Sequence, residues 1–423
     1  MKRGVIAAAL VGALALLAGV ALVGYRVFKP QETLTRPDVA YPSVMMITDE
    51  RPFSELRAAP LVVENRLRVY AEKRRVWSDA PVGGRYEATP YWSYRRWPAQ
   101  VVGVASVSIA KDPFVITQWS DGEVITLNAR LGEIVWRTKA QGGASSYDGR
   151  RTGASVVYEP QSLLTVKTRD SAVIVVTAPG LVTALAADTG TVLWQREVEG
   201  GCEPAAWTAP ALLVLPACSG ATLEFVEPTS GRTRERWTPE RGVAQRDLCA
   251  LGRTECRLVR ADGKAWLLGS NGTLTAVPPI EDGAVLAGER VILQTPEGVV
   301  ARRLRDGSPL WTYKGTGTLI AADTVGVYLL LKDRTLIALS PVTGHLSVLG
   351  CAAAAATEDW QIGHIYTTDG SYVALERITR EPASSKDQLY YYGPRPVALV
   401  ELYPPNKLPV WPGKFAACGR LPE

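Results

Sequence analysis

The 423-residue chain is poor in the residues from which most catalytic and metal sites are built. It contains two histidines, His345 and His364, and its six cysteines include no Cys-x-x-Cys pair. Zinc sites and thiol–disulfide redox sites usually depend on such spacings, so neither kind of site is expected. A Ser/His/Asp triad would also require one of these histidines, and no recognisable nucleophile motif accompanies them.

The sequence also lacks the short motifs of common enzyme and nucleotide sites. It has no Gly-x-Ser-x-Gly elbow, no Gly-rich phosphate loop and no EF-hand pattern. The carboxylates are scattered, and the neighbours Asp121 and Glu123 lie at an Asp-Gly turn that is typical of a solvated hairpin tip. The net charge of +5 is dispersed, without a basic block of the kind that binds nucleic acid. We therefore expect no catalytic, cofactor-binding or metal-binding residues and no nucleic-acid partner.

One long apolar segment is present, near the N-terminus. Residues 4–24 carry no charge and follow Met1-Lys2-Arg3. About 20 apolar residues are enough to span a bilayer as a helix, whereas the apolar region of a cleaved signal peptide usually has about 7–15. The length predicts an uncleaved transmembrane anchor, although small residues at 18–21 would also permit cleavage.

All six cysteines lie beyond this segment. An even number of cysteines behind an export segment predicts disulfides and places the body of the protein outside the cytoplasm. The sequence cannot choose among the pairings, and buried free thiols are the alternative. Our working hypothesis pairs nearest neighbours: Cys202 with Cys218, Cys249 with Cys256, and Cys351 with Cys418.

A strand–turn–strand unit recurs along the chain, most clearly at residues 173–194. Short apolar runs are separated there by the turns Ala178-Pro179-Gly180 and Asp188-Thr189-Gly190. In three copies a tryptophan follows the turn glycine by four residues. Glycine adopts the positive φ of the turn, and the strand period of two then fixes the face that carries the indole. These tryptophans are predicted to dock each repeat on its neighbour: Trp136, Trp194 and Trp311.

The spacing of the repeats indicates the architecture. The intervals fit a unit of about 40 residues built from short strands, which is the size of a propeller blade. The predicted fold is all-β, a propeller with seven or eight four-stranded antiparallel blades, preceded by one N-terminal transmembrane helix. The expected domains are an anchor or signal peptide at 1–29, a linker at 30–60 and the propeller at 61–423.

The repeat resembles that of the pyrroloquinoline-quinone-type (PQQ-like) β-propellers, whose pattern is Ala-Leu-Asp-x-x-Thr-Gly-x-x-x-Trp. The best match is at Ala184-Leu185, Thr189-Gly190 and Trp194. The quinone-dependent dehydrogenases of this family carry adjacent cysteines and a Glu/Asn/Asp calcium site, and no such pattern is found in this sequence. The resemblance is closer to the non-enzymatic, BamB-like branch, although the lipidation cysteine of that branch is missing. It implies a protein without a cofactor that is not an enzyme.

These features together predict a membrane-anchored, extracytoplasmic propeller that binds envelope or membrane proteins as a scaffold. The alternative is a degenerate or unrecognised enzyme of the quinone-dependent dehydrogenase or glycan-acting type. A candidate partner surface combines Trp92, Tyr94 and Trp97 with Tyr391, which a closed ring would bring nearby. The same aromatics could instead form blade core and ring closure, because strands bury alternate residues.

Overall fold

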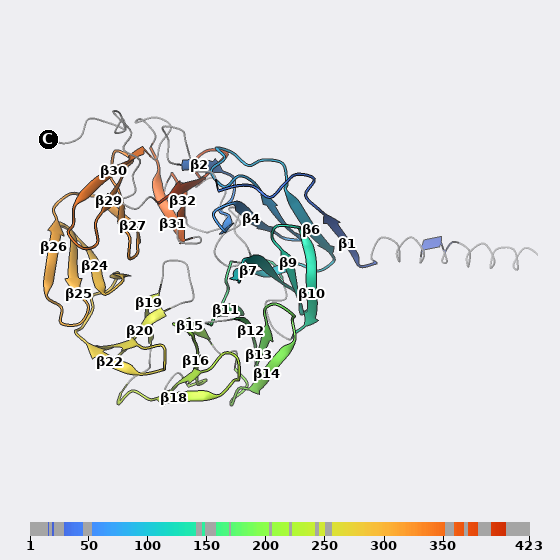
Figure 1. Cartoon of the computed structure of the whole chain (residues 1–423), viewed down its shortest axis with the longest axis horizontal. Coiled ribbons are helices and arrows are strands. Elements are labelled where there is room, and N and C mark those ends of the chain that lie inside the picture. Colours follow the sequence, from blue (N-terminus) through green and yellow to red (C-terminus); the bar gives the residue numbers. More distant parts are fainter. Residues whose placement is uncertain are drawn as a thin grey trace, which may run out of the picture.

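The computed structural model shows a closed ring of sheets (Figure 1). The described residues are 16, 19–20, 29–44, 53–140, 146–148, 158–168, 171–202, 205–219, 222–241, 245–249, 256–351, 359–367, 371–379 and 391–402. They form eight sheets, and every strand pairing within these sheets is antiparallel. The protein is therefore an eight-bladed β-propeller, the larger of the two blade numbers that the repeat spacing allowed.

The first four blades follow one another in sequence, and each begins with its innermost strand. Blade 1 contains β3 (Leu61–Val63), β4 (Leu67–Glu72), β5 (Arg75–Asp79) and β6 (Trp92–Trp97), with β1 (Gln31–Thr35) added outside β6. Blade 2 contains β7 (Val101–Ile109), β8 (Asp112–Trp119), β9 (Glu123–Asn128) and β10 (Glu133–Lys139). Blade 3 contains β11 (Leu163–Lys167), β12 (Ala172–Ala178), β13 (Leu181–Ala186) and β14 (Val192–Glu197). Blade 4 contains β15 (Trp207–Ala209), β16 (Leu212–Pro216), β17 (Leu223–Val226) and β18 (Thr233–Trp237).

The remaining blades complete the ring. Blade 5 contains β19 (Gln245–Cys249), β20 (Cys256–Ala261), β21 (Lys264–Leu268) and β22 (Leu274–Val277). Blade 6 contains β23 (Val285–Ala287), β24 (Arg290–Thr295), β25 (Gly298–Arg303) and β26 (Pro309–Tyr313). Blade 7 contains β27 (Thr318–Ala322), β28 (Val327–Leu330), β29 (Thr335–Leu339) and β30 (Leu346–Cys351). Blade 8 contains β31 (Gln361–Thr367), β32 (Tyr372–Ile378), β33 (Val397–Glu401) and, outermost, β2 (Phe53–Leu56).

Antiparallel pairing gives the ring two distinct faces. Turns between the second and third strands of a blade, together with the connections between blades, lie on one face, which we call the middle-turn face. Turns between the first and second strands and between the third and outermost strands lie on the other, the outer-turn face. Loops on the two faces of such a rigid disc can carry separate binding sites.

Burial follows the position of each strand in its blade. All seven side chains of β12 are buried, because both faces of this second strand are covered by neighbouring blades. The side chains of β14, on the rim, are half-buried or exposed. This difference explains why the second strand reads as a continuous apolar run rather than as an alternation.

The ring closes where a strand from the N-terminal part of the chain pairs with a strand from the C-terminal part. β2 pairs with β33 in the register Phe53↔Val400 to Leu56↔Val397, so blade 8 combines N-terminal and C-terminal strands. β1 and β2 both lie within residues 30–60, the segment expected to be a linker, so these strands belong to the propeller. β1 has a polar, exposed sequence without strand periodicity. Its conformation depends on the exposed edge of β6, which is a tertiary feature.

Four tryptophans join successive blades with one repeated geometry. Each indole contacts a glycine at positive φ in the next blade, and its Nε1 donates to the carbonyl three residues before that glycine. The donor–acceptor pairs are Trp92 to Ala129 (2.8 Å), Trp136 to Ala187 (2.9 Å), Trp194 to Pro228 (2.7 Å) and Trp311 to Pro341 (3.0 Å). The indole therefore supplies both apolar contact and a directional hydrogen bond at these four junctions.

The expected membrane segment at residues 4–24 falls almost wholly outside the described residues. Within the part of the chain that the structure describes, no helix is both long enough and apolar enough to cross a bilayer.

The disulfide predicted between Cys202 and Cys218 is confirmed. It joins the connection after β14 to the turn between β16 and β17, and thus links blades 3 and 4. Cys256 is also disulfide-bonded, and Cys249 lies opposite it in the backbone register of β19 and β20. Cys418 and the side chain of Cys351 lie outside the described residues.

Removing the Cys202–Cys218 disulfide should destabilise the propeller. The bond closes a loop with a sequence separation of 16. Closing a loop of that length lowers the conformational entropy of the unfolded chain, which stabilises the folded state by about 3 kcal/mol. The variant with both cysteines replaced by serine should therefore lose about 3 kcal/mol of its free energy of unfolding, measured in urea. Glu197→Ala, exposed in the rim strand β14, is the control and should change stability little. Equal stability of the serine variant and the wild type would contradict the expectation.

Candidate functional site

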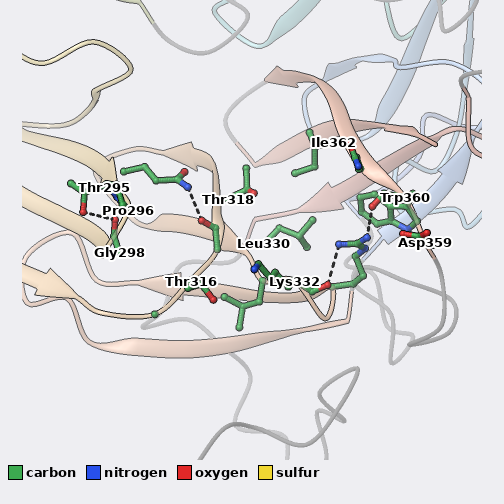
Figure 2. A pocket seen from close by; sticks show the side chains of 16 residues that line it. Thr295, Pro296, Gly298, Thr316, Thr318, Leu330, Lys332, Asp359, Trp360 and Ile362 are labelled. Atoms are coloured by element: carbon green, nitrogen blue, oxygen red, sulfur yellow. Dashed lines mark hydrogen bonds between the residues drawn. The ribbon is translucent and has the colours of Figure 1, made fainter. Parts of the chain in front are cut away.

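A cavity with a mixed polar and apolar lining opens on the middle-turn face between blades 6, 7 and 8 (Figure 2). Its volume is about 750 Å³. Four segments line it: the β24–β25 turn at 294–298, the β26–β27 connection at 315–318, the β28–β29 turn at 330–334 and the approach to β31 at 359–362. The site is thus assembled from three blades that follow one another in the chain.

Arg334 fixes the wall between blades 7 and 8. Its backbone has a φ of 69°, in the left-handed region, and its guanidinium lies 4.5 Å from the centre of the Trp360 ring. One guanidinium nitrogen donates to the Trp360 carbonyl and another to the Lys332 carbonyl, at 3.1 Å for the latter. Trp360 is 1% exposed. The planar cation stacked on a buried indole makes this wall a preformed part of the site.

Gln294 fixes the opposite wall. Its side-chain amide donates to the Gly317 carbonyl at 2.8 Å and accepts from the Leu319 N–H at 2.8 Å. Both ends of one side chain therefore hold the connection that carries the exposed Thr316 and Thr318. This connection is held in place although it contains two glycines and no regular structure.

The lining is suited to hydrogen bonding. It presents threonine hydroxyls and glutamine amides, together with exposed side chains of opposite charge, Lys332 and Asp359. Within the described ranges no group of three or more His, Cys, Asp and Glu side chains could hold a metal ion. Such a mixture of donors, acceptors and both charges fits recognition of a polar surface or peptide segment.

A second, smaller cavity lies on the outer-turn face between blades 3, 4 and 5. Its volume is about 580 Å³. Glu227 and Arg234, two of the lining residues, form an ion pair at 2.7 Å. Hydrogen bonds from Ser230 and Arg234 lower the pKa of Glu227, so this carboxylate is charged at neutral pH. The pair leaves less free charge here than in the first cavity.

The predicted docking residues lie where blades meet. Trp136, Trp194 and Trp311 each contact the next blade through the geometry described above. The spacing rule missed a fourth, Trp92, because Ala88 replaces the glycine four positions earlier. The sequence did contain the other half of this junction: Gly132 of blade 2, which contacts Trp92, belongs to a recognised copy of the repeat.

The aromatic residues suggested as a partner surface are mostly interior. Trp92 and Tyr94 are fully buried in blade 1, with Trp92 directed at blade 2. Trp97 is half-buried beneath the guanidinium of Arg74, at 3.8 Å, and Tyr391 is 9% exposed beside β32. An exposed patch built on Trp92 and Tyr94 is therefore ruled out, and their burial follows the strand alternation that offered the alternative explanation.

The two histidines are found apart from both cavities. His345 is exposed after the β29–β30 turn, and His364 is exposed in β31, with its ring centre 6.0 Å from that of Tyr366.

Comparison with known proteins identifies relatives of the repeat. The profile of the family described as outer membrane protein assembly factor BamB matches residues 121–345. The crystal structure of BamB from Moraxella catarrhalis is 13% identical, with 88% of this chain and 100% of that chain covered and a TM-score of 0.44. The structure of U3-55K is 10% identical, with 72% and 98% covered and a TM-score of 0.38. No protein of curated function matches the chain.

Proposed function

The chain belongs to the family of the outer membrane protein assembly factor BamB, whose profile covers more than half of it, and from this premise we propose a scaffold that binds other proteins in the bacterial cell envelope. The family match is the observation that carries the proposal. A rigid propeller with a cavity on each face supports it, because such a disc can hold more than one partner.

The proposed location is the extracytoplasmic side of a membrane, with residues 4–24 as a single-pass anchor. The uncharged length of this segment supports an uncleaved helix. The Cys202–Cys218 disulfide supports an oxidising compartment, since such bonds are rare in the cytosol. The domain assignment becomes an anchor at 1–29 and a propeller that also recruits strands from 30–60.

We place the partner contact at the cavity of Figure 2. Lys332 and Asp359 are exposed at this cavity and have no ion-pair partner within the described ranges. Unpaired charges of opposite sign beside hydroxyl and amide groups fit a complementary polar segment of an envelope or membrane protein. The proposed function includes no enzymatic step and no cofactor, and purified protein given pyrroloquinoline quinone and calcium is expected to bind no quinone.

Photo-crosslinking in intact cells tests this assignment. A photoreactive residue at Thr316, in the cavity, should give a discrete protein adduct. The same residue at Thr343 is the matched control, because this exposed threonine lies on the outer-turn face of blade 7. Lys332→Glu should reduce the Thr316 adduct about tenfold, as expected for loss of a complementary charge. Equal yields at the two threonines, or no adduct at Thr316, would contradict the cavity as the contact site.

A further inference from the structure

The chain enters the propeller at the middle-turn face of blade 1. Gln31, the first residue of β1, lies opposite Trp97 at the end of β6, and Arg74 of the β4–β5 turn lies over the Trp97 ring. Only the six residues 25–30 separate β1 from the uncharged segment that ends at residue 24. Six extended residues span about 20 Å, so an anchored chain keeps this end of blade 1 close to the bilayer.

β1 is held firmly against two blades. Glu32 pairs with Arg96 of β6 at 3.2 Å and with Arg137 of β10 at 3.0 Å, and Arg36 pairs with Glu133 at 3.3 Å. Burial opposes ionisation of Glu32, but hydrogen bonding and charge from Arg137 and charge from Arg96 hold its pKa below the ordinary value. β1, the strand that follows the anchor, is therefore fixed to the rim of the propeller. The position of β1 then sets how the propeller is oriented relative to the bilayer.

Most acidic groups at this end are paired with arginines, whereas Asp148 is exposed in the β10–β11 connection and has no ion-pair partner within the described ranges. Glu72 pairs with Arg75 at 2.6 Å. Asp121 and Glu123, at the β8–β9 turn, pair with Arg96 at 3.0 and 2.9 Å. Together with Glu32, these are four carboxylates that share three arginines, Arg75, Arg96 and Arg137, so one negative charge is left in excess.

Several basic groups remain unneutralised at the same end. Lys29 precedes β1, Lys73 is in the β4–β5 turn, Arg95 is in β6 and Lys139 ends β10. All four are exposed, and none has an ion-pair partner within the described ranges. These four positive charges outnumber the unpaired acidic charges at this end, so the net charge is positive where the chain arrives from the anchor. Each Lys or Arg close to an anionic lipid surface strengthens attachment about fivefold.

We propose that the middle-turn end of blades 1 and 2 rests on the anionic headgroups of the bilayer that holds the anchor. This inference depends on the proposed anchoring. The disc then meets the membrane at blades 1 and 2, and the cavity of blades 6 to 8 lies on the same middle-turn face, with blade 8 next to blade 1 (Figure 1).

A pair of lysines provides a matched test in the full-length chain reconstituted into vesicles. Lys73 and Lys111 are both exposed in tight turns, but Lys111 lies in the β7–β8 turn on the opposite face. Each is replaced in turn by a photoreactive lysine analogue that retains the charge, and lipid adducts are measured by mass spectrometry. With vesicles that contain phosphatidylglycerol, adducts at position 73 should exceed those at 111 at least tenfold.

Charge dependence and membrane retention separate the possible outcomes. Arg95→Glu with Lys139→Glu should reduce the adduct at position 73 at least fivefold, and raised salt should reduce it as well. Adducts at 73 that match those at 111, or a yield that is the same with neutral lipid, would overturn the lipid contact while leaving the anchoring intact. Release of the chain from vesicles by alkaline washing would instead contradict the anchoring, and this inference with it.

Discussion

Replacing Asp79 by alanine should lower the free energy of unfolding by about 3–5 kcal/mol. Asp79 and Arg68 are both fully buried in blade 1 and form a bidentate pair with N–O distances of 2.7 and 2.6 Å. Arg68 also donates to the carbonyls of Gly84 and Tyr86, and Asp79 accepts from the Ala88 N–H at 2.8 Å. Loss of the carboxylate leaves a buried guanidinium without a counter-ion and frees the loop between β5 and β6.

Two further variants show whether the charge pair itself is responsible. Asp79→Asn retains the shape but removes the charge, and it should also destabilise the protein by several kcal/mol because Arg68 stays charged. The double variant Arg68→Met with Asp79→Leu should recover part of the loss, since no buried charge remains. Urea unfolding followed by circular dichroism measures these differences. A double variant less stable than Asp79→Ala would indicate that the backbone bonds, rather than the buried charge, dominate.

Gly190→Ala should cost about 2–5 kcal/mol through two additive effects. Gly190 has a φ of 71°, which disfavours any residue with a Cβ. A Cβ there would lie 2.4 Å from Cε3 of the Trp136 ring, whose Nε1 is held by the Ala187 carbonyl. The indole therefore cannot withdraw without losing its hydrogen bond, and blades 2 and 3 must separate.

A matched glycine separates the steric effect from the backbone effect. Gly263 has a φ of 69°, but a Cβ there would meet no atom within 4 Å. Gly263→Ala should therefore cost only about 1–2 kcal/mol. In a Trp136→Leu background the cost of Gly190→Ala should fall to the Gly263 value. Equal effects of the two glycine substitutions in the wild-type background would contradict the wedge between the indole and the turn.

The repeat, its period and its family could be predicted from the sequence because blade formation is local. In each blade hairpins join adjacent strands, so turn glycines and apolar runs appear in order along the chain. The turn glycine and the tryptophan four residues later also mark the junctions between blades. Gly190 of blade 3 contacts Trp136 of blade 2, and Trp194 of blade 3 in turn contacts blade 4. The Cys202–Cys218 pair was predictable for the same reason, being close in sequence.

Only the tertiary structure decided the features that join distant segments. The sequence of β1 is polar and exposed, and its strand conformation depends on the edge of β6. β2 pairs with β33 across almost the whole length of the chain, which completes blade 8 and sets the blade number at eight. The cavity of Figure 2 needs three blades side by side, and Trp360 and Gln294 carry no motif that predicts it.

The physical reason for this division is the range of the interactions. Turn conformation and strand period are set by neighbours within a few residues, so the sequence of one repeat determined the blade and, by repetition, the propeller. Ring closure, the β1 clamp and the cavity depend on edges and surfaces that exist only after the blades have assembled. Trp92 illustrates the limit: the sequence identified this large apolar side chain, but only its packing against Gly132 of the next blade decided that it lies inside.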